Sequence, residues 1–259
     1  MMYQFVEYSI VERVCMIVLN RADKKNAFNF QLVKELKEAL QKATHDAEVK
    51  SIVIKANGTV FSAGADLDYL QRLQQNTFEE NLADSNHLKE LFEMIYLLPK
   101  LVIAQIEGHA IAGGCGLATV CDFSFAVPEA MFGYTEVKIG FIPAIVSFFL
   151  VRKIGEGKAR ELLLTGKLIS AEEAYKANII NFISTKEQIS ADVFAFAKKM
   201  NEETSGDSIA MTKELIASIP YMHTNIALST AAEANANARA GNDCKRGIAA
   251  FLNKEKIIW

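Results

Sequence analysis

Two short stretches of small residues, each following a strand-like segment, are the places where this sequence could do chemistry through its backbone. Ala112–Gly116 (AGGCG) follows the aliphatic run Leu101–Glu107, and Ala63–Ala65 (AGA) follows Ser51–Ala56 by a few residues. A helix that begins among such residues exposes unpaired N–H groups at the positive end of its dipole. Two corners of this kind could each donate one N–H to a ligand oxygen that becomes negative during a reaction.

Nucleotide binding is the obvious alternative for glycines at a strand-to-helix corner. The dinucleotide pattern GxGxxG is absent here, and no Lys-Ser/Thr pair follows the glycines. By itself the first stretch is most typical of a glycine-rich packing turn. The second stretch repeats its layout, and this repetition favours a paired site for an oxyanion.

Composition narrows the class of protein. A length of 259 residues, of which 51% are hydrophobic and 23% charged, predicts one large domain or a domain with an appendage. The net charge of −3 provides no basic surface for nucleic acid, so no nucleic-acid partner is expected. The longest apolar run, Phe141–Val151, is too short to span a bilayer, so no membrane partner is expected. No metal-ligand spacing occurs, and the cysteines lack CxxC spacing, which is typical of a reduced, cytoplasmic protein: Cys15, Cys115, Cys121 and Cys244.

Hydrophobic periodicity predicts strands and helices that alternate in the first two-thirds of the chain, followed by helices alone. Strands are expected at Val6–Ser9, Val14–Leu19, Ser51–Ala56, Leu101–Glu107, Phe123–Ala126, Ala130–Phe132 and Ile179–Ile183. Residues 71–85 are polar without a clear period and are predicted to form a mobile lid. The Ala-rich helical end would expose too much apolar surface alone, so it should pack on the core or on a neighbouring subunit.

Three blocks of sequence then resemble the signature motifs of the crotonase (enoyl-CoA hydratase/isomerase) family. They are FSAGAD, GHAIAGGCGLATVCD and FGYTEVKIGFIP, in this order, and the likeness continues to GIAAFLNKEK near the end. The resemblance implies an α/β fold in which residues 1–190 form a crotonase-like spiral core of ββα units. It implies that residues 191–259 form a C-terminal helical region for trimerisation or as a lid. Members of the family are usually trimers or dimers of trimers.

The resemblance also implies the chemistry. The substrate would be an acyl-CoA thioester, whose carbonyl oxygen becomes an enolate oxyanion when a proton or water is moved beside it. The N–H groups of Ala65 and Gly113 would stabilise that oxyanion, and Glu136 would transfer the proton. Apolar neighbours in the third motif should desolvate Glu136 and raise its affinity for a proton.

One position departs from the family pattern. Hydratases with two glutamates carry the first one twenty residues before the second, where this chain has Gly116. Another acid from the Asp66–Glu93 region could replace it, water could fill the gap, or the reaction could need one carboxylate only. The favoured prediction is that the protein is an enoyl-CoA hydratase, which adds water across a 2,3 double bond. Branched or methylglutaconyl-type thioesters are among the substrates considered. The alternatives are a 3,2-enoyl-CoA isomerase and a non-catalytic scaffold that binds CoA or associates with RNA.

Coenzyme A is expected only as part of the substrate, with no separate cofactor. By resemblance its contacts would come from Lys24, Lys25, Ala27, Ala63, Asp66, Gly116, Phe251 and Lys254. His109 lies beside the glycine corner, but a structural role is expected for it. Cys115 has no motif for a base and an orienting group, which disfavours it as a nucleophile.

Overall fold

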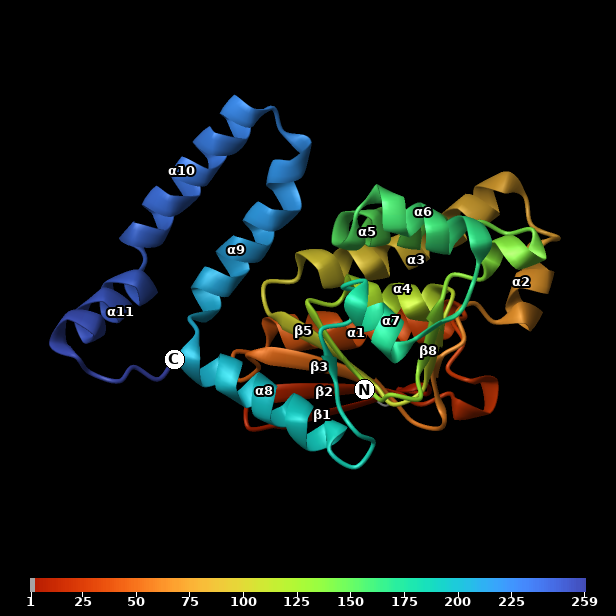
Figure 1. The fold of residues 1–259 in the computed structure, drawn as a ribbon, viewed down its shortest axis with the longest axis horizontal. Coiled ribbons are helices and arrows are strands. Elements are labelled where there is room, and N and C mark those ends of the chain that lie inside the picture. Colours follow the sequence, from red (N-terminus) through yellow and green to blue (C-terminus); the bar gives the residue numbers. More distant parts are fainter. Residues whose placement is uncertain (1–2) are drawn as a thin grey trace.

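The computed structural model describes residues 3–259 (Figure 1), and its core contains two sheets. The larger sheet has the order β1-β2-β3-β5-β7-β10, and the smaller has the order β4-β6-β8-β9. The strands of the larger sheet are β1 (Val6–Val11), β2 (Val14–Leu19), β3 (Ser51–Ala56), β5 (Leu101–Ile106), β7 (Phe123–Ala126) and β10 (Phe182–Ile183). Those of the smaller sheet are β4 (Val60–Ser62), β6 (His109–Ile111), β8 (Met131–Gly133) and β9 (Ile169–Ser170).

The chain alternates between these two sheets. Each turn of the spiral places one strand in the larger sheet and the next in the smaller one: β3 then β4, β5 then β6, β7 then β8. Strand β6 pairs in parallel with both β4 and β8. Because the carboxyl ends of parallel neighbours share one edge of a sheet, the three loops that follow β4, β6 and β8 meet there.

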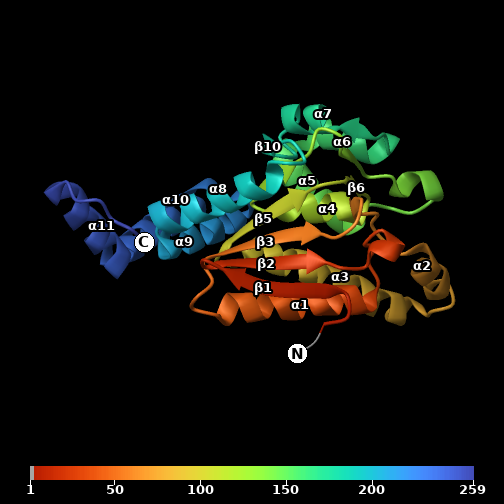
Figure 2. The same ribbon diagram turned by 90° about the horizontal axis from the view of Figure 1, so that it is seen from below.

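Helices cover both faces of the larger sheet. Helix α1 (Phe30–His45) packs on β1 and β2, and α8 (Ile189–Glu203) packs on β2, β3, β5 and β7 (Figure 2). All six residues of β5 are buried, which explains its unbroken aliphatic sequence. Further helices of the core are α4 (Gly113–Val120), α5 (Ala144–Ile154), α6 (Glu156–Thr165) and α7 (Ala171–Lys176), with 3-10 turns η1 (Ala22–Lys24) and η2 (Glu136–Ile139).

The residues predicted to form a mobile lid, 71–85, are largely helical, and their mobility stays a prediction. Helix α2 (Leu67–Leu73) is followed by α3 (Phe78–Leu97), which begins with a capping box between Thr77 and Glu80. The capping signal Thr-x-x-Glu is present in the sequence, but the first three turns of α3 bury no residue, so no hydrophobic period marks them. The predicted strand at Ile179–Ile183 is likewise reduced to the two residues of β10.

The C-terminal helices α9 (Gly206–Ser218), α10 (Thr224–Ala240) and α11 (Asn242–Asn253), joined through η3 (Ile219–Tyr221), form an arm that projects from the core (Figure 1). The predicted boundary at residue 190 falls at the start of α8, which packs on the sheet. Large apolar side chains on the arm are exposed: Ile216, Ile226, Leu228, Ile248, Phe251 and Leu252. Among residues 3–259, no helix is long and apolar enough to cross a membrane, and no cluster of His, Cys, Asp and Glu could hold a metal ion.

Candidate active site

The loops after β4 and β6 touch each other at Gly64 and Gly113. A Cβ added at Gly64 would lie 3.0 Å from the Gly113 nitrogen and 2.7 Å from the Ala112 Cβ. Gly64 also has φ +83°, a conformation that side chains with a Cβ rarely adopt. Both the contact and the backbone angle therefore require glycine, and the two corners predicted from the sequence lie side by side.

Among residues 3–259, local hydrogen bonding leaves one N–H group at each corner free to bind a ligand. Phe28 forms a parallel bridge with Ala65, in which the Phe28 N–H donates to the Gly64 carbonyl (2.6 Å) and the Asp66 N–H donates to the Phe28 carbonyl (2.9 Å). The bonded groups flank Ala65, so its own N–H points away from Phe28. Gly113 is the first residue of α4, where an N–H has no partner within the helix. Both residues are partly accessible, so a ligand oxygen can approach them.

Ala112 sets the direction of the chain as it enters α4. Its φ of 52° and ψ of −126° are unusual for a residue with a Cβ and cost on the order of 1–3 kcal/mol. The Ala112 N–H donates to the Gly133 carbonyl (2.7 Å), and the Gly116 N–H donates to the Ala112 carbonyl (3.0 Å). Such strain, held by β8 on one side and by α4 on the other, is typical of functional sites.

Glu136 lies just after β8, on the third loop at the same edge. Its side chain is buried, with 9% of the residue exposed, and its Oε2 atom has no hydrogen-bond partner among residues 3–259. Burial raises the pKa of Glu136 above that of a free glutamate. A buried carboxylate with one unpartnered oxygen and a high affinity for protons is suited to accept and return a proton.

Gly116 lies one turn into α4, and the space beside it is already filled. A Cβ at this position would lie 2.1 Å from Val146 Cγ1 and 3.1 Å from a ring carbon of Phe92. A glutamate therefore cannot stand there unless α5 moves or Val146 is made smaller. Val146 therefore occupies the space that the first glutamate of the two-glutamate pattern would need at position 116.

A buried ion pair supports the first corner. Arg21 and Asp66 are joined at 2.6 Å with side chains 10% and 6% exposed, and Arg21 Nη1 also donates to the Ala27 carbonyl (2.9 Å). Asn26 ties the same loop down by donating to the carbonyls of Asn57 and Val60. Sequence reasoning missed Arg21 and Asn26, because the run NRADKKNAFN is typical of a solvated loop and only the tertiary structure buries it.

The carboxylate of Asp66 is fully occupied within the chain. One oxygen accepts from Arg21, and the other accepts from the Tyr69 N–H as the N-cap of α2. Burial alone would raise the pKa of Asp66, but the bonds from Arg21 and Tyr69 outweigh it and hold the pKa below its ordinary value. A depressed pKa means that this ion pair stabilises the fold above about pH 4 and loses its effect as the pH falls through the folded-state value.

Asp66→Ala is expected to lower the free energy of unfolding by about 3–5 kcal/mol, because it leaves the Arg21 charge buried without a partner. The matched control is Asp68→Ala, which removes an exposed ion pair with Lys24 (2.8 Å) and should change stability by less than about 1 kcal/mol. Urea denaturation at pH 7 measures both. Equal stability of the two variants would contradict this role for the pair.

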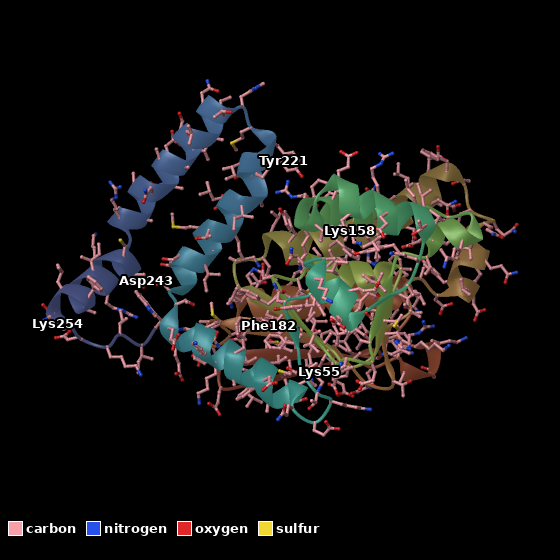
Figure 3. The ribbon with its side chains drawn as sticks, in the orientation of Figure 1. Lys55, Lys158, Phe182, Tyr221, Asp243 and Lys254 are labelled. Atoms are coloured by element: carbon pink, nitrogen blue, oxygen red, sulfur yellow. The ribbon has the colours of Figure 1, made fainter. Side chains whose placement is uncertain are left out.

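Apart from Asp66 and Gly116, described above, the residues predicted to contact coenzyme A fall into two groups. Lys24 and Lys25 are exposed beside the first corner, and the Lys25 carbonyl accepts from the Ala63 N–H (3.0 Å). Ala27 is buried in the same loop. Phe251 and Lys254 belong to the end of α11, and Lys254 lies at the far end of the arm (Figure 3), on the side of the molecule opposite α2 (Figure 1). One chain therefore does not bring these two groups together.

The two other side chains at the glycine corner have structural surroundings. His109 Nδ1 accepts from the Met131 N–H (3.1 Å), which ties β6 to β8. Cys115 is fully buried, and burial raises the pKa of its thiol to about 12, so the reactive thiolate is disfavoured. Cys15, Cys115, Cys121 and Cys244 are free thiols; the reduced, cytoplasmic setting stays a prediction.

Comparison with known proteins assigns this architecture. The family model described as enoyl-CoA hydratase/isomerase matches residues 9–259. A relative from Thermus thermophilus, named as a candidate enoyl-CoA hydratase, is 39% identical over 241 residues, which cover 93% of this chain and 95% of its own. The crotonyl-CoA hydratase of Syntrophomonas wolfei is 32% identical, covering 99% and 98% of the two chains.

A solved structure agrees over nearly the whole length. The crystal structure of an enoyl-CoA hydratase from Shewanella pealeana superimposes with a TM-score of 0.92 at 31% identity, covering 99% of this chain and 96% of that one. The spiral of ββα units and the motifs at its three loops therefore have one explanation: the chain belongs to the enoyl-CoA hydratase/isomerase family, the crotonase superfamily that its sequence resembles.

Proposed function

We propose that this protein acts on enoyl-CoA thioesters. The reaction that we favour is the addition of water across a 2,3 double bond. The observation that carries the proposal is the edge where β4, β6 and β8 end, because it gathers two free N–H groups and one buried carboxylate. The names of the relatives from Thermus thermophilus and Syntrophomonas wolfei support hydration.

In this mechanism the thioester oxygen accepts hydrogen bonds from the N–H groups of Ala65 and Gly113. Glu136 takes a proton from water as the oxygen of that water attacks C3, and the electron pair of the double bond moves toward the thioester, where the two N–H groups stabilise the enolate. A proton then returns to C2. The raised pKa of Glu136 brings its proton affinity nearer to what such a transfer needs at neutral pH.

An alternative reaction is the migration of a double bond from the 3- to the 2-position. The packing of Val146 against Gly116 is the observation that supports it. Isomerisation needs one carboxylate, which removes a proton from C2 and returns it to C4. Val146 fills the space where a second carboxylate would stand. Three acidic residues of the Asp66–Glu93 region have partners elsewhere: Asp66 pairs with Arg21, Asp68 pairs with Lys24, and Asp84 accepts from the Tyr69 hydroxyl.

One assay separates the candidates. Purified protein is offered straight-chain and branched 2-enoyl-CoAs, including a methylglutaconyl thioester, and the corresponding 3-enoyl-CoAs, while the absorbance of the 2,3-enoyl thioester is followed. Loss of this absorbance from 2-enoyl substrates supports hydration. Its appearance from 3-enoyl substrates, with hydration at background, would establish the isomerase instead. If neither set of substrates is converted but CoA esters still bind, the result would support the non-catalytic scaffold.

Gly116→Glu alone is expected to destabilise the protein and abolish activity, because the new side chain collides with Val146. The double variant Gly116→Glu with Val146→Gly removes the colliding methyl groups and should recover much of the stability. If the enzyme is a hydratase, the double variant should also keep or raise the rate of hydration. Thermal midpoints and rates for the single and double variants test this, with Val146→Gly as the control. No recovery of stability in the double variant would refute the packing argument.

Assembly into a trimer or a dimer of trimers follows from the same proposal. The arm exposes a series of apolar side chains that a neighbouring copy would cover, and the contacts predicted for Phe251 and Lys254 would then be made to coenzyme A bound by another subunit. Light scattering coupled to size-exclusion chromatography measures the mass. A monomer at micromolar concentration would contradict this assembly.

A further inference from the structure

The C-terminal end of α4 is closed by side chains rather than by continuing backbone bonds. The Ala118 carbonyl accepts from Ser124 Oγ (2.8 Å), and the carbonyls of Thr119 and Cys121 both accept from Lys153 Nζ (2.8 and 3.0 Å). The last carbonyls of a helix otherwise have no partner. One ammonium group therefore satisfies two carbonyls at the negative end of the helix whose other end is the glycine corner.

Lys153 reaches this position from α5, which packs along α4. Val146 near the start of α5 fills the notch at Gly116, and Lys153, seven residues later on the same face, bonds the end of α4. The contacts follow the same order along both helices. Helix α4 is thus held at its middle by a methyl group and at its end by a cation.

Two further charged side chains, Asp122 and Lys213, lie near the C-terminal end of α4. Asp122 accepts from the Val102 N–H (2.8 Å) and from Lys213 Nζ (2.5 Å), and Lys213 also donates to the Lys100 carbonyl (2.9 Å). Burial lowers the pKa of Lys153, and the nearby carboxylate of Asp122 opposes that effect. Lys213 belongs to α9, so the C-terminal arm contacts Asp122, the same carboxylate that acts on the pKa of Lys153.

We propose that Lys153 is a positioning residue for the oxyanion corner: by bonding the last carbonyls of α4 it holds the whole helix in place, and with it the N–H of Gly113. The helix is eight residues long, so the two ends are about 12 Å apart and a shift at one end is transmitted to the other. A displacement of about 1 Å at a catalytic group can cost about 10²-fold in rate. The inference rests on the proposed role of Gly113 in the reaction.

The kinetic test uses whichever enoyl-CoA isomer the wild-type protein converts. Lys153→Met should lower kcat by about 10- to 100-fold while KM changes by less than about threefold, because the binding surface for CoA is untouched. Lys153→Arg keeps a cation that can bond both carbonyls and should restore most of kcat. The control is Lys176→Met, which removes an exposed ion pair with Glu172 in α7 and should leave kcat unchanged.

A spectroscopic test does not depend on turnover. Acetoacetyl-CoA is a 3-oxoacyl thioester whose enolate absorbs in the near ultraviolet, and two correctly placed N–H donors raise the fraction of enolate when it binds. Lys153→Met should bind this ester with less enolate absorbance at saturation, and Lys153→Arg should regain it. A wild-type protein that converts no enoyl-CoA would refute the proposed reaction, whereas the enolate signal would still report the position of the donors.

Two results would overturn the inference. One is a folded Lys153→Met protein with wild-type kcat and wild-type enolate absorbance. The other is a wild-type protein that binds acetoacetyl-CoA without an enolate signal, since the donors would then not act on the thioester oxygen. If Lys153→Met does not fold, Lys153→Gln replaces it, and equal kcat and equal enolate absorbance in Lys153→Gln and Lys153→Arg would exclude a requirement for the cation.

Discussion

Turnover should fall by about 10²–10⁴-fold when Glu136 is replaced by glutamine. Glutamine keeps the shape of the side chain but cannot accept the proton, whereas the two N–H donors and the CoA contacts remain. Steady-state kinetics on the preferred enoyl-CoA measure the loss, and calorimetry should find unchanged binding of a non-reacting acyl-CoA. A variant within a few-fold of wild type would remove Glu136 from the mechanism.

The same substitution has a signature in pH and stability. Because the pKa of Glu136 is raised by burial, wild-type kcat/KM should lose activity toward acid with a midpoint above the ordinary value for glutamate, and the variant should lack this limb. The folded state also binds this proton more tightly than the unfolded state does. The free energy of unfolding therefore falls as pH rises from the unfolded pKa through the folded one, and this penalty is absent from the variant. Glu136→Gln should be at least as stable as wild type at pH 7, as measured by urea denaturation.

Gly113→Pro is the second change with a large expected effect. Proline removes the N–H that Gly113 offers at the start of α4, and loss of one such donor costs about 10²–10³-fold in kcat. Its ring would also crowd Phe28, because a Cβ at Gly113 already lies 3.3 Å from the Phe28 ring. Activity should vanish from the standard assay even where the far-ultraviolet circular dichroism shows a folded protein.

Gly113→Ala separates the lost donor from the added bulk. Alanine keeps the N–H, and the contact of its Cβ with the Phe28 ring needs a shift of only a few tenths of an ångström. This variant should therefore lose far less activity than Gly113→Pro and should retain enolate absorbance with acetoacetyl-CoA. A folded and active Gly113→Pro protein would refute the assignment of this N–H to the oxyanion.

The sequence by itself determined the family and most of the element order. The strand Val14–Leu19 and the buried run that starts at Leu101 could be predicted because strands covered on both faces are continuously aliphatic, a local property of the chain. The helix start within AGGCG was visible for the same kind of reason, since small residues permit the tight turn. The motifs also indicated Glu136 as the carboxylate, a role that stays a prediction.

Only the tertiary structure decided what these residues face. The parallel order β4-β6-β8 brings together loops that are about fifty and about twenty residues apart in the chain, and no local pattern encodes which strands will pair. It is also the fold that buries Arg21 against Asp66 and places Lys153 under the end of α4. The space beside Gly116 is closed by Val146, a residue thirty positions later, because packing depends on the volumes of residues that meet across helices rather than on neighbours in sequence.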